Sequence, residues 1–325
     1  MLSRTADHLF WLSRYMERAE NTARLLDVNY QTSLLPQSHS TAEQGWRSLL
    51  SISELSGHYG TLHDQVDAKR VTDYIVRDER NPSSIVSCLR AARENARAVR
   101  GALTTEVWET TNQTWLEFKR LLADGLLARD PSAVFEWVKF RSHLSRGVMV
   151  GTMYQDEAFD FIRIGSFLER ADNTARLLDV KFHAMDHEFH GDADARDSAR
   201  DFYHWSSVLR SVSGFEVYRK VYSNVIKPEK VAELLILRTQ MPRSLAHCTE
   251  RLLSNLRRVA NDQSGETLRQ AGRLNAELEF GRIDEILATG LHAFLTQFLE
   301  RVGNLGDGIS RDFLMPTESR EPRMN

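Results

Sequence analysis

The sequence predicts an all-α protein formed by tandem duplication of a helical-bundle module, with the two copies packed about a pseudo-twofold axis. Residues that interrupt helices are scarce, since the 325 residues include only 7 Pro and 17 Gly. One segment occurs twice, and its apolar residues recur at the spacing of a single helix face. No segment alternates apolar and polar residues as a half-buried strand does.

The repeated segment comprises residues 15–30, YMERAENTARLLDVNY, and residues 167–182, FLERADNTARLLDVKF. Eleven of the sixteen positions are identical, and four of the other five are conservative exchanges. The exception is Asn29, which stands opposite Lys181. An internal match of this quality indicates duplication of a structural unit.

Weaker matches follow in the same order in both halves, so that Trp46 corresponds to Trp205 and Cys88 to Cys248. We therefore expect one helical module over residues 1–150 and a second over 151–313, each with four to six helices. Residues 314–325 are nearly free of apolar side chains and are expected to be a disordered tail. A continuous solenoid is the alternative, although two copies are few for one.

Individual helices follow from the same periodicity and from start signals. Pro82 and Pro131 are each followed by serine and mark expected helix starts, because proline is tolerated in the first turn. Residues 106–127 and 265–287 are each expected to form one long helix. The apolar stripe of the first repeated helix consists of Leu12, Tyr15, Ala19, Ala23, Leu26 and Tyr30.

The repeated helix also carries a polar face opposite its apolar stripe. Glu17, Asn21 and Arg24 share this face at spacings of four and three residues. Apolar residues at both ends of the face, Phe10 and Val28 in the first copy, indicate a helix buried on two sides, whose charges must be paired. The candidate site therefore comprises Glu17, Arg18, Asn21, Arg24, Glu169, Arg170, Asn173 and Arg176.

Two interpretations of this site remain open from the sequence. In the first, the residues form a structural ion-pair network in which Glu17 faces Arg176 and Glu169 faces Arg24. In the second, they line a polar cleft between the modules, where the arginines bind a carboxylate or phosphate group with two parallel hydrogen bonds.

A second candidate is the arginine-rich segment 90–100, RAARENARAVR, which partly repeats the signature helix. Its arginines fall on one helical face, which is typical of solvated surface and, alternatively, of a binding site for an acidic partner. The residues concerned are Arg90, Arg93, Asn95, Arg97 and Arg100.

Histidines after the second repeated helix superficially resemble a metal site, since His183 and His187 have a spacing found in helical zinc sites. The segment continues into an acidic, loop-like stretch that has no counterpart in the first copy. We therefore expect no metal ligand here, and no cofactor anywhere in the chain.

The composition and the missing motifs argue against several classes of function. The net charge of -3 gives no global case for nucleic-acid binding, and no apolar stretch is long enough to span a bilayer. Without a secretory signal, the two cysteines are expected to be reduced core residues of a cytoplasmic protein. Phosphate-binding loops, dinucleotide fingerprints, nucleophile elbows and zinc-protease motifs are missing, so no catalytic residue is assigned.

The doubled motif, in RYMERAENTARLLD and SFLERADNTARLLD, together with ARENARAVR and VWETTNQ, closely resembles the bacterial alpha-E domain family over residues 1–313. The Glu-Arg signature of that family falls on Glu17-Arg18 and Glu169-Arg170. Its members are typically encoded beside, or fused to, circularly permuted ATP-grasp proteins, transglutaminase-like proteins and an amidohydrolase-like peptidase. The resemblance thus implies a system that makes or modifies a peptide or an amide-linked small molecule.

The leading hypothesis is a non-catalytic scaffold or substrate-holding subunit for the ATP-grasp ligase, with the transglutaminase-like protein as a further partner. The competing hypothesis is an enzyme of the same pathway that uses Glu17 and Glu169 as acid-base groups in an inter-module cleft. Carboxylates facing solvent would favour the enzyme, and a sealed Glu-Arg network would favour the scaffold. A metal-binding bundle is a weaker third hypothesis, because the repeated Glu/His ligand sets of such bundles are missing.

Overall fold

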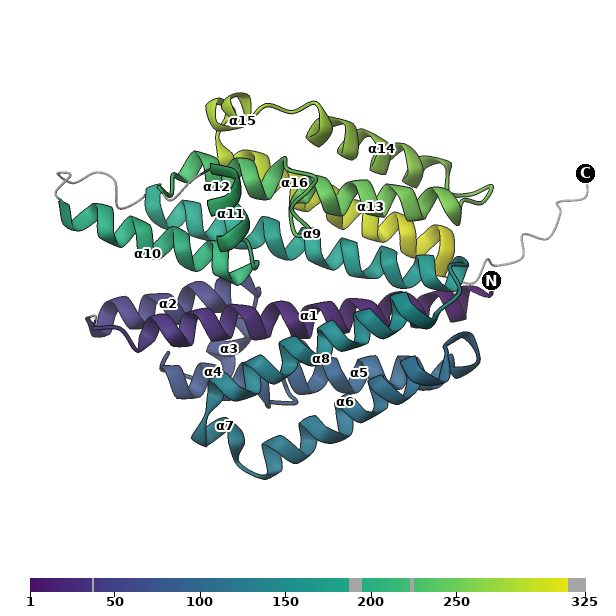
Figure 1. Cartoon of the computed structure of the whole chain (residues 1–325), viewed down its shortest axis with the longest axis horizontal. Helices are drawn as coiled ribbons and strands as arrows, with labels where there is room; N and C mark the ends of the chain where they lie inside the picture. The colour runs from purple at the N-terminus through teal and green to yellow at the C-terminus, as the bar shows by residue number, and fades with distance from the viewer. Residues whose placement is uncertain (37, 187–194, 223–224, 315–325) are drawn as a thin grey trace, which may run out of the picture.

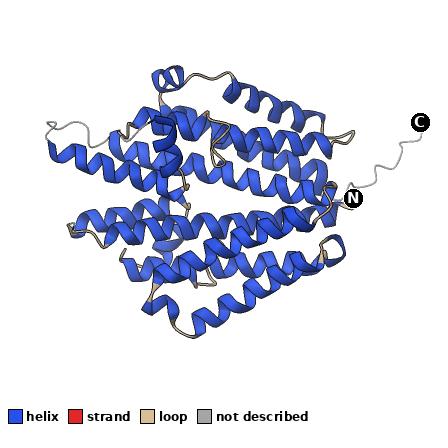
Figure 2. Cartoon of the chain, viewed as in Figure 1, coloured by secondary structure: helices blue, strands red, loops and turns tan. Residues whose placement is uncertain are grey.

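The computed structural model describes residues 1–36, 38–186, 195–222 and 225–314, and every regular element in these ranges is helical (Figure 2). The prediction of an all-α fold is therefore confirmed for the described chain. None of its helices combines the length and apolarity needed to cross a membrane. The helices of the first half are α1 (Ser3–Ser33), α2 (His39–Ile52), α3 (Ser56–Leu62), α4 (Ala68–Val76), α5 (Ile85–Ala98), α6 (Thr105–Ala123), α7 (Leu126–Arg129) and α8 (Pro131–Thr152), with a short 3-10 turn at Arg100–Ala102.

The second half repeats this order of long and short helices. Its elements are α9 (Glu157–Asp186), α10 (Ala195–Ser211), α11 (Phe215–Tyr222), α12 (Pro228–Ile236), α13 (Leu245–Arg258), α14 (Gly265–Glu279), α15 (Ile283–Thr289) and α16 (Leu291–Ile309), followed by a π-helical turn at Ser310–Leu314. Each half thus has more described helices than the four to six expected. The pseudo-twofold axis and the module boundaries stay predictions.

The two repeated helices, α1 and α9, lie side by side at the centre of the molecule and pack most extensively against each other (Figure 1). Helices α5 and α8 cover α1, whereas α13 and α16 cover α9. A central helix with neighbours on all sides must bury polar as well as apolar positions. As predicted from its two-sided pattern, α1 buries Glu17 and Asn21 along with Leu12 and Leu26.

A glycine sets the distance between α1 and α9. A Cβ atom on Gly165 would lie 2.3 Å from the backbone oxygen of Phe10 and 2.3 Å from the hydroxyl of Ser13. At their N-terminal ends, the amino group of Met1 lies 2.6 Å from the Glu157 carboxylate. The two helices therefore run in the same direction, with equivalent positions of the repeat at the same height.

The predicted helix boundaries needed three corrections. Helix α5 begins at Ile85 and not at Pro82, because Ser84 caps it by accepting a hydrogen bond from the Ser87 amide. Residues 106–127 form two helices, since the chain turns at Gly125, whose φ of 72° lies in the left-handed region. Residues 265–287 likewise divide into α14 and α15. The start at Pro131 was predicted correctly.

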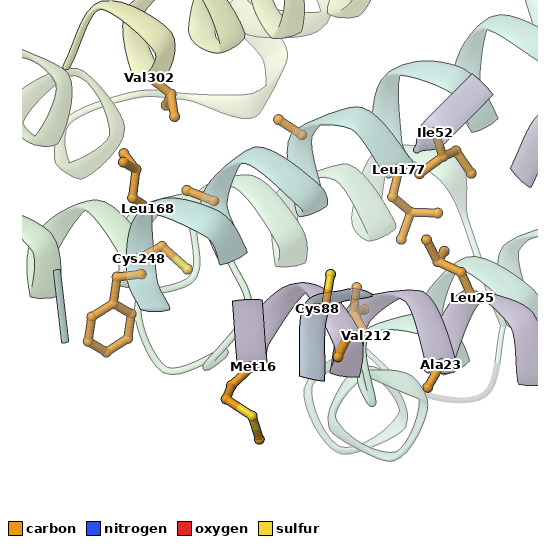
Figure 3. Packing of buried hydrophobic residues seen from close by; sticks show 14 of the residues in the cluster. Met16, Ala23, Leu25, Ile52, Cys88, Leu168, Leu177, Val212, Cys248 and Val302 are labelled. Atoms are coloured by element: carbon orange, nitrogen blue, oxygen red, sulfur yellow. The ribbon is translucent and has the colours of Figure 1, made fainter. Parts of the chain in front are cut away.

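Both cysteines belong to the apolar core, as predicted. Cys88 and Cys248 lie in the first turns of α5 and α13, and their side chains are fully buried (Figure 3). Burial raises the pKa of each thiol to about 12. These thiols therefore serve packing and are protonated at neutral pH.

Candidate functional site

The Glu-Arg motifs of α1 and α9 pair with each other across the interface between the two helices. Glu17 accepts hydrogen bonds from Nε and Nη2 of Arg170, at 2.9 and 2.8 Å. Glu169 accepts them from Nε and Nη2 of Arg18, at 2.6 and 3.0 Å. Each glutamate is thus held bidentately by the arginine of the other copy, a geometry that fixes orientation as well as charge.

The first of these pairs belongs to a larger network. Arg243, in the loop before α13, donates to Glu17 at 3.0 Å and to Glu20 at 2.5 Å. It also donates to the Asn21 side-chain oxygen at 2.6 Å. Arg146 of α8 donates to Glu17 at 3.2 Å and also to Glu20. Four elements, α1, α8, α9 and the loop before α13, therefore meet at two carboxylates.

The second pair has fewer partners and is more accessible. Arg14 adds one hydrogen bond to Glu169 at 2.7 Å. The side chains of Arg14 and Arg18 are 18% and 27% exposed, whereas those of Arg170 and Arg243 are 8% and 7% exposed. Glu17 is therefore the more deeply buried of the two carboxylates, although its further partner Arg146 is 38% exposed.

The charges of this network are fixed by mutual pairing. Burial alone would raise the pKa of Glu17, but Arg170 and Arg243 outweigh burial and lower this pKa to about 2. Arg243 likewise holds the pKa of Glu20 well below its usual range despite burial. For Glu169, Arg14 and Arg18 have the same effect. All three carboxylates are therefore ionised at neutral pH.

Acidification is expected to destabilise the protein through these groups. Because the folded pKa of Glu17 lies below the ordinary value of 4.5, its contribution is complete above pH 4.5 and is lost as the pH falls toward 2. The lost contribution is on the order of 3 kcal/mol. Calorimetric melting between pH 7 and pH 3 should show a fall in Tm that is smaller in Glu17→Gln. Equal falls in both proteins would contradict this assignment.

The predicted ion pairs between the two copies, Glu17 with Arg176 and Glu169 with Arg24, were wrong. The arginine that pairs with each glutamate lies about two helical turns earlier in the helix. Glu17 does not pair with Arg176, which instead contacts Asp172 at 2.8 Å and also Glu54. Arg24 pairs not with Glu169 but with Glu20, at 2.7 Å. In parallel helices only equivalent heights face each other, and residue 176 lies roughly 9 Å beyond residue 170.

The other predicted residues are placed as follows. Arg18, Asn21, Glu169 and Arg170 join the network with Glu17, whereas Asn173 is partly exposed. Reasoning from the sequence missed Glu20, Arg14, Arg146 and Arg243. For Glu20, the sequence offered one signal, which is that Asp172 keeps an acidic residue at the same position of the repeat. Arg146 and Arg243 lie in distant segments, so the repeated helix gave no indication that they would contact it.

The arginine-rich segment 90–100 forms most of α5 and the 3-10 turn after it, and does not present a free basic face. Arg90 pairs with Glu79 at 2.6 Å and Arg97 with Glu94 at 2.7 Å. The remaining three residues bond or stack on neighbouring helices: Arg93 donates to Asn112, Arg100 lies over Trp108, and Asn95 contacts His8. Acidic neighbours therefore neutralise Arg90 and Arg97, whereas the exposed Arg100 stacks on Trp108.

A small cavity adjoins the network on its α8 side. Its volume is about 60 Å³, and Arg146, Arg163 and Arg170 line it together with four serines. Arg163 forms no ion pair with a described residue and stacks on Phe159 and Phe167, with its guanidinium 5.7 and 4.7 Å from the ring centres. The described network thus contains more arginines than carboxylates, and the cavity has room for a small anion or for water.

The described part of the chain contains no group of three His, Cys, Asp or Glu residues placed to hold a metal ion. The segment from His183 to His190 lies outside the described residues, apart from the backbone of residues 183–186 in α9.

The chain is similar to one known protein family and to several mycobacterial proteins. The family model of Alpha-E, a predicted alpha-helical domain with a conserved ER motif, matches residues 1–314. Uncharacterized proteins of Mycobacterium bovis and of two strains of Mycobacterium tuberculosis are each 26% identical over 320 residues, which cover 91% of this chain and 35% of each relative. The chain thus spans about a third of the length of these relatives, and no solved structure matches it. The protein belongs to the Alpha-E family.

Proposed function

We propose that this chain is a non-catalytic helical scaffold, or substrate-holding subunit, of a circularly permuted ATP-grasp ligase in a bacterial cytoplasmic system for peptide or amide-bond synthesis. In this proposal the two halves are related by a pseudo-twofold axis between α1 and α9. The observation that carries it is the Glu-Arg network at the centre of the molecule, whose carboxylates are buried. Such a network joins two helical units and leaves their outer surfaces for partners.

The competing enzyme hypothesis has less support from the geometry. A general acid or base needs a pKa near the working pH and must reach its substrate. Glu17 is 3% exposed and has a pKa of about 2, and Glu169 is 5% exposed. Each is also bound by two or more arginine side chains. Neither carboxylate is therefore suited to proton transfer.

An exposed stripe on α8 supports a partner-binding role. Phe140 and Leu144 are 67% and 47% exposed, and Tyr154, just beyond the helix, is 85% exposed. Phe140, Leu144 and the exposed Gly147 and Gly151 recur every three or four residues along one face of α8, and Tyr154 follows the end of the helix. A face of this kind suits the apolar side of a partner helix, because small residues allow close approach and large ones supply buried area.

The length of the mycobacterial relatives also supports association. The matched region accounts for 35% of each relative, so most of each polypeptide lies outside the helical domain. A helical domain that is joined covalently to other segments in one protein is a candidate for non-covalent association in another.

Co-purification tests the proposal directly. The tagged chain should retain an ATP-grasp protein encoded by a neighbouring gene, and the ATP-dependent ligase activity of that protein should fall when the chain is omitted. The double variant Phe140→Glu/Leu144→Glu should weaken retention, whereas Arg97→Glu on the exposed side of α5 should not. If the wild-type chain retains no such protein, and the ligase is equally active without it, the proposal is wrong.

A further inference from the structure

A cavity of about 510 Å³ lies away from the Glu-Arg network, where the C-terminal parts of α1 and α9 meet α2 and α10. These four helices converge at one end of the molecule (Figure 1). Leu25 and Ile52, which are labelled in Figure 3, contribute to both the apolar core and the cavity wall. The volume falls within the range of roughly 300–1,000 Å³ that is typical of small-molecule sites.

One basic side chain enters this mostly apolar space. Lys181 of α9 lines the cavity, and no described carboxylate pairs with its ammonium group. By contrast, the partly buried Lys139 is held by Asp27 at 2.7 Å and by Glu136. Loss of water around Lys181 lowers its pKa to about 8. The protein thus keeps a charge in an environment that disfavours it, which is costly unless a ligand supplies the missing anion.

A second polar group in the wall also lacks a partner. The hydroxyl of Ser48 is buried and has no hydrogen-bond partner among the described residues. The Ser48 oxygen has almost no accessible surface and does not face the cavity, so the charge that the cavity offers to a ligand is that of Lys181.

The charge of Lys181 is present in only one copy of the duplicated segment. Asn29 and Lys181 occupy the one non-conservative position of the repeated segment, and both line the cavity. The other differing positions of the segment are conservative exchanges, and the identical ones include the Glu-Arg pairs of the network. A change from amide to amine on the wall of a shared cavity favours the binding of a negatively charged group.

We propose that this cavity binds a small carboxylate with an apolar body, whose carboxylate pairs with Lys181 and whose body packs against Leu25, Val28 and Ile52. A single amine suits a monoanion, whereas phosphate groups are usually held by several cations or by a helix N-terminus. No arginine lines the cavity, and Lys181 is its only lysine among the described residues. This site is separate from the scaffold role and does not depend on it.

Calorimetric titration of the full chain at pH 7 tests the proposal with octanoate, and with octylamine as a probe of equal length and opposite charge. Octanoate should bind saturably, and octylamine should not. Lys181→Asn, which installs the residue of the first copy, should weaken octanoate binding at least tenfold. Lys69→Asn changes a lysine that is 83% exposed on α4 and should bind octanoate as the wild type does.

A second measurement follows the amine itself. After reductive ¹³C-methylation, the NMR signal that is absent from Lys181→Asn should titrate with a pKa near 8 and shift upward when octanoate is added. Circular dichroism of the variant checks that it is folded. Equal octanoate affinity in wild type and Lys181→Asn would overturn the proposal. So would a folded wild type that binds neither octanoate nor 3-phenylpropanoate saturably.

Discussion

Replacing Glu17 by alanine is expected to lower the free energy of unfolding by about 3–5 kcal/mol, because it leaves buried arginines without their counter-charge. Arg170 and Arg243 both donate to this carboxylate, and neither side chain is more than 8% exposed. Arg146 would lose one of its two acceptors. Urea denaturation of the wild type and the variant, followed by circular dichroism, measures the difference.

Two further variants give this experiment its controls. Glu169→Ala should cost less than Glu17→Ala, because Arg14 and Arg18 can regain water at the surface. Glu94→Ala removes an exposed carboxylate on α5 and should change stability by less than about 1 kcal/mol. A loss below about 1 kcal/mol for Glu17→Ala would show that the network is not structural, and would revive the ligand-site interpretation.

Replacing Gly165 by alanine is expected to destabilise the protein by about 1–3 kcal/mol. The new Cβ atom would lie 2.3 Å from the Phe10 backbone oxygen, which cannot move without displacing α1. The helices would have to separate, and the ion pairs between them would lengthen. The direction of the stability change is informative, because alanine normally stabilises a helix interior by about 0.5–1 kcal/mol relative to glycine.

Gly272→Ala in α14 is the matched control for this substitution. A Cβ atom at Gly272 would meet nothing within 4 Å, so this variant should melt at the wild-type temperature or above it. Thermal denaturation of both variants compares the same chemical change in two environments. A stabilised Gly165→Ala would mean that α1 and α9 do not approach each other as closely as described.

The reciprocal pairing explains why a costly buried network is retained. Replacing buried ion pairs by apolar residues is often neutral or stabilising, so their value lies more in specifying one arrangement than in net stability. Here each bidentate bond between Glu17 and Arg170, and between Glu169 and Arg18, requires equal heights on the two helices. A shift of α1 along α9 by one turn would break both pairs at once.

The sequence by itself determined the features that depend on local periodicity and on the duplication. Helical content followed from the scarcity of helix breakers, and the two-sided burial of α1 followed from apolar residues at both ends of its polar face. The core position of Cys88 and Cys248 followed from their places beside apolar residues in matched helix starts. These features are properties of single helices, and a 3.6-residue period encodes them directly.

Only the tertiary structure decided which charges meet. The identity of the partners of Glu17 depends on the relative height and rotation of α1 and α9, and on two segments more than 100 residues away that carry Arg146 and Arg243. The cavity around Lys181 likewise forms from four helices, none of which shows it alone. The physical reason is that helix periodicity fixes the direction of a side chain on its own helix, whereas the contact it makes depends on how whole helices pack.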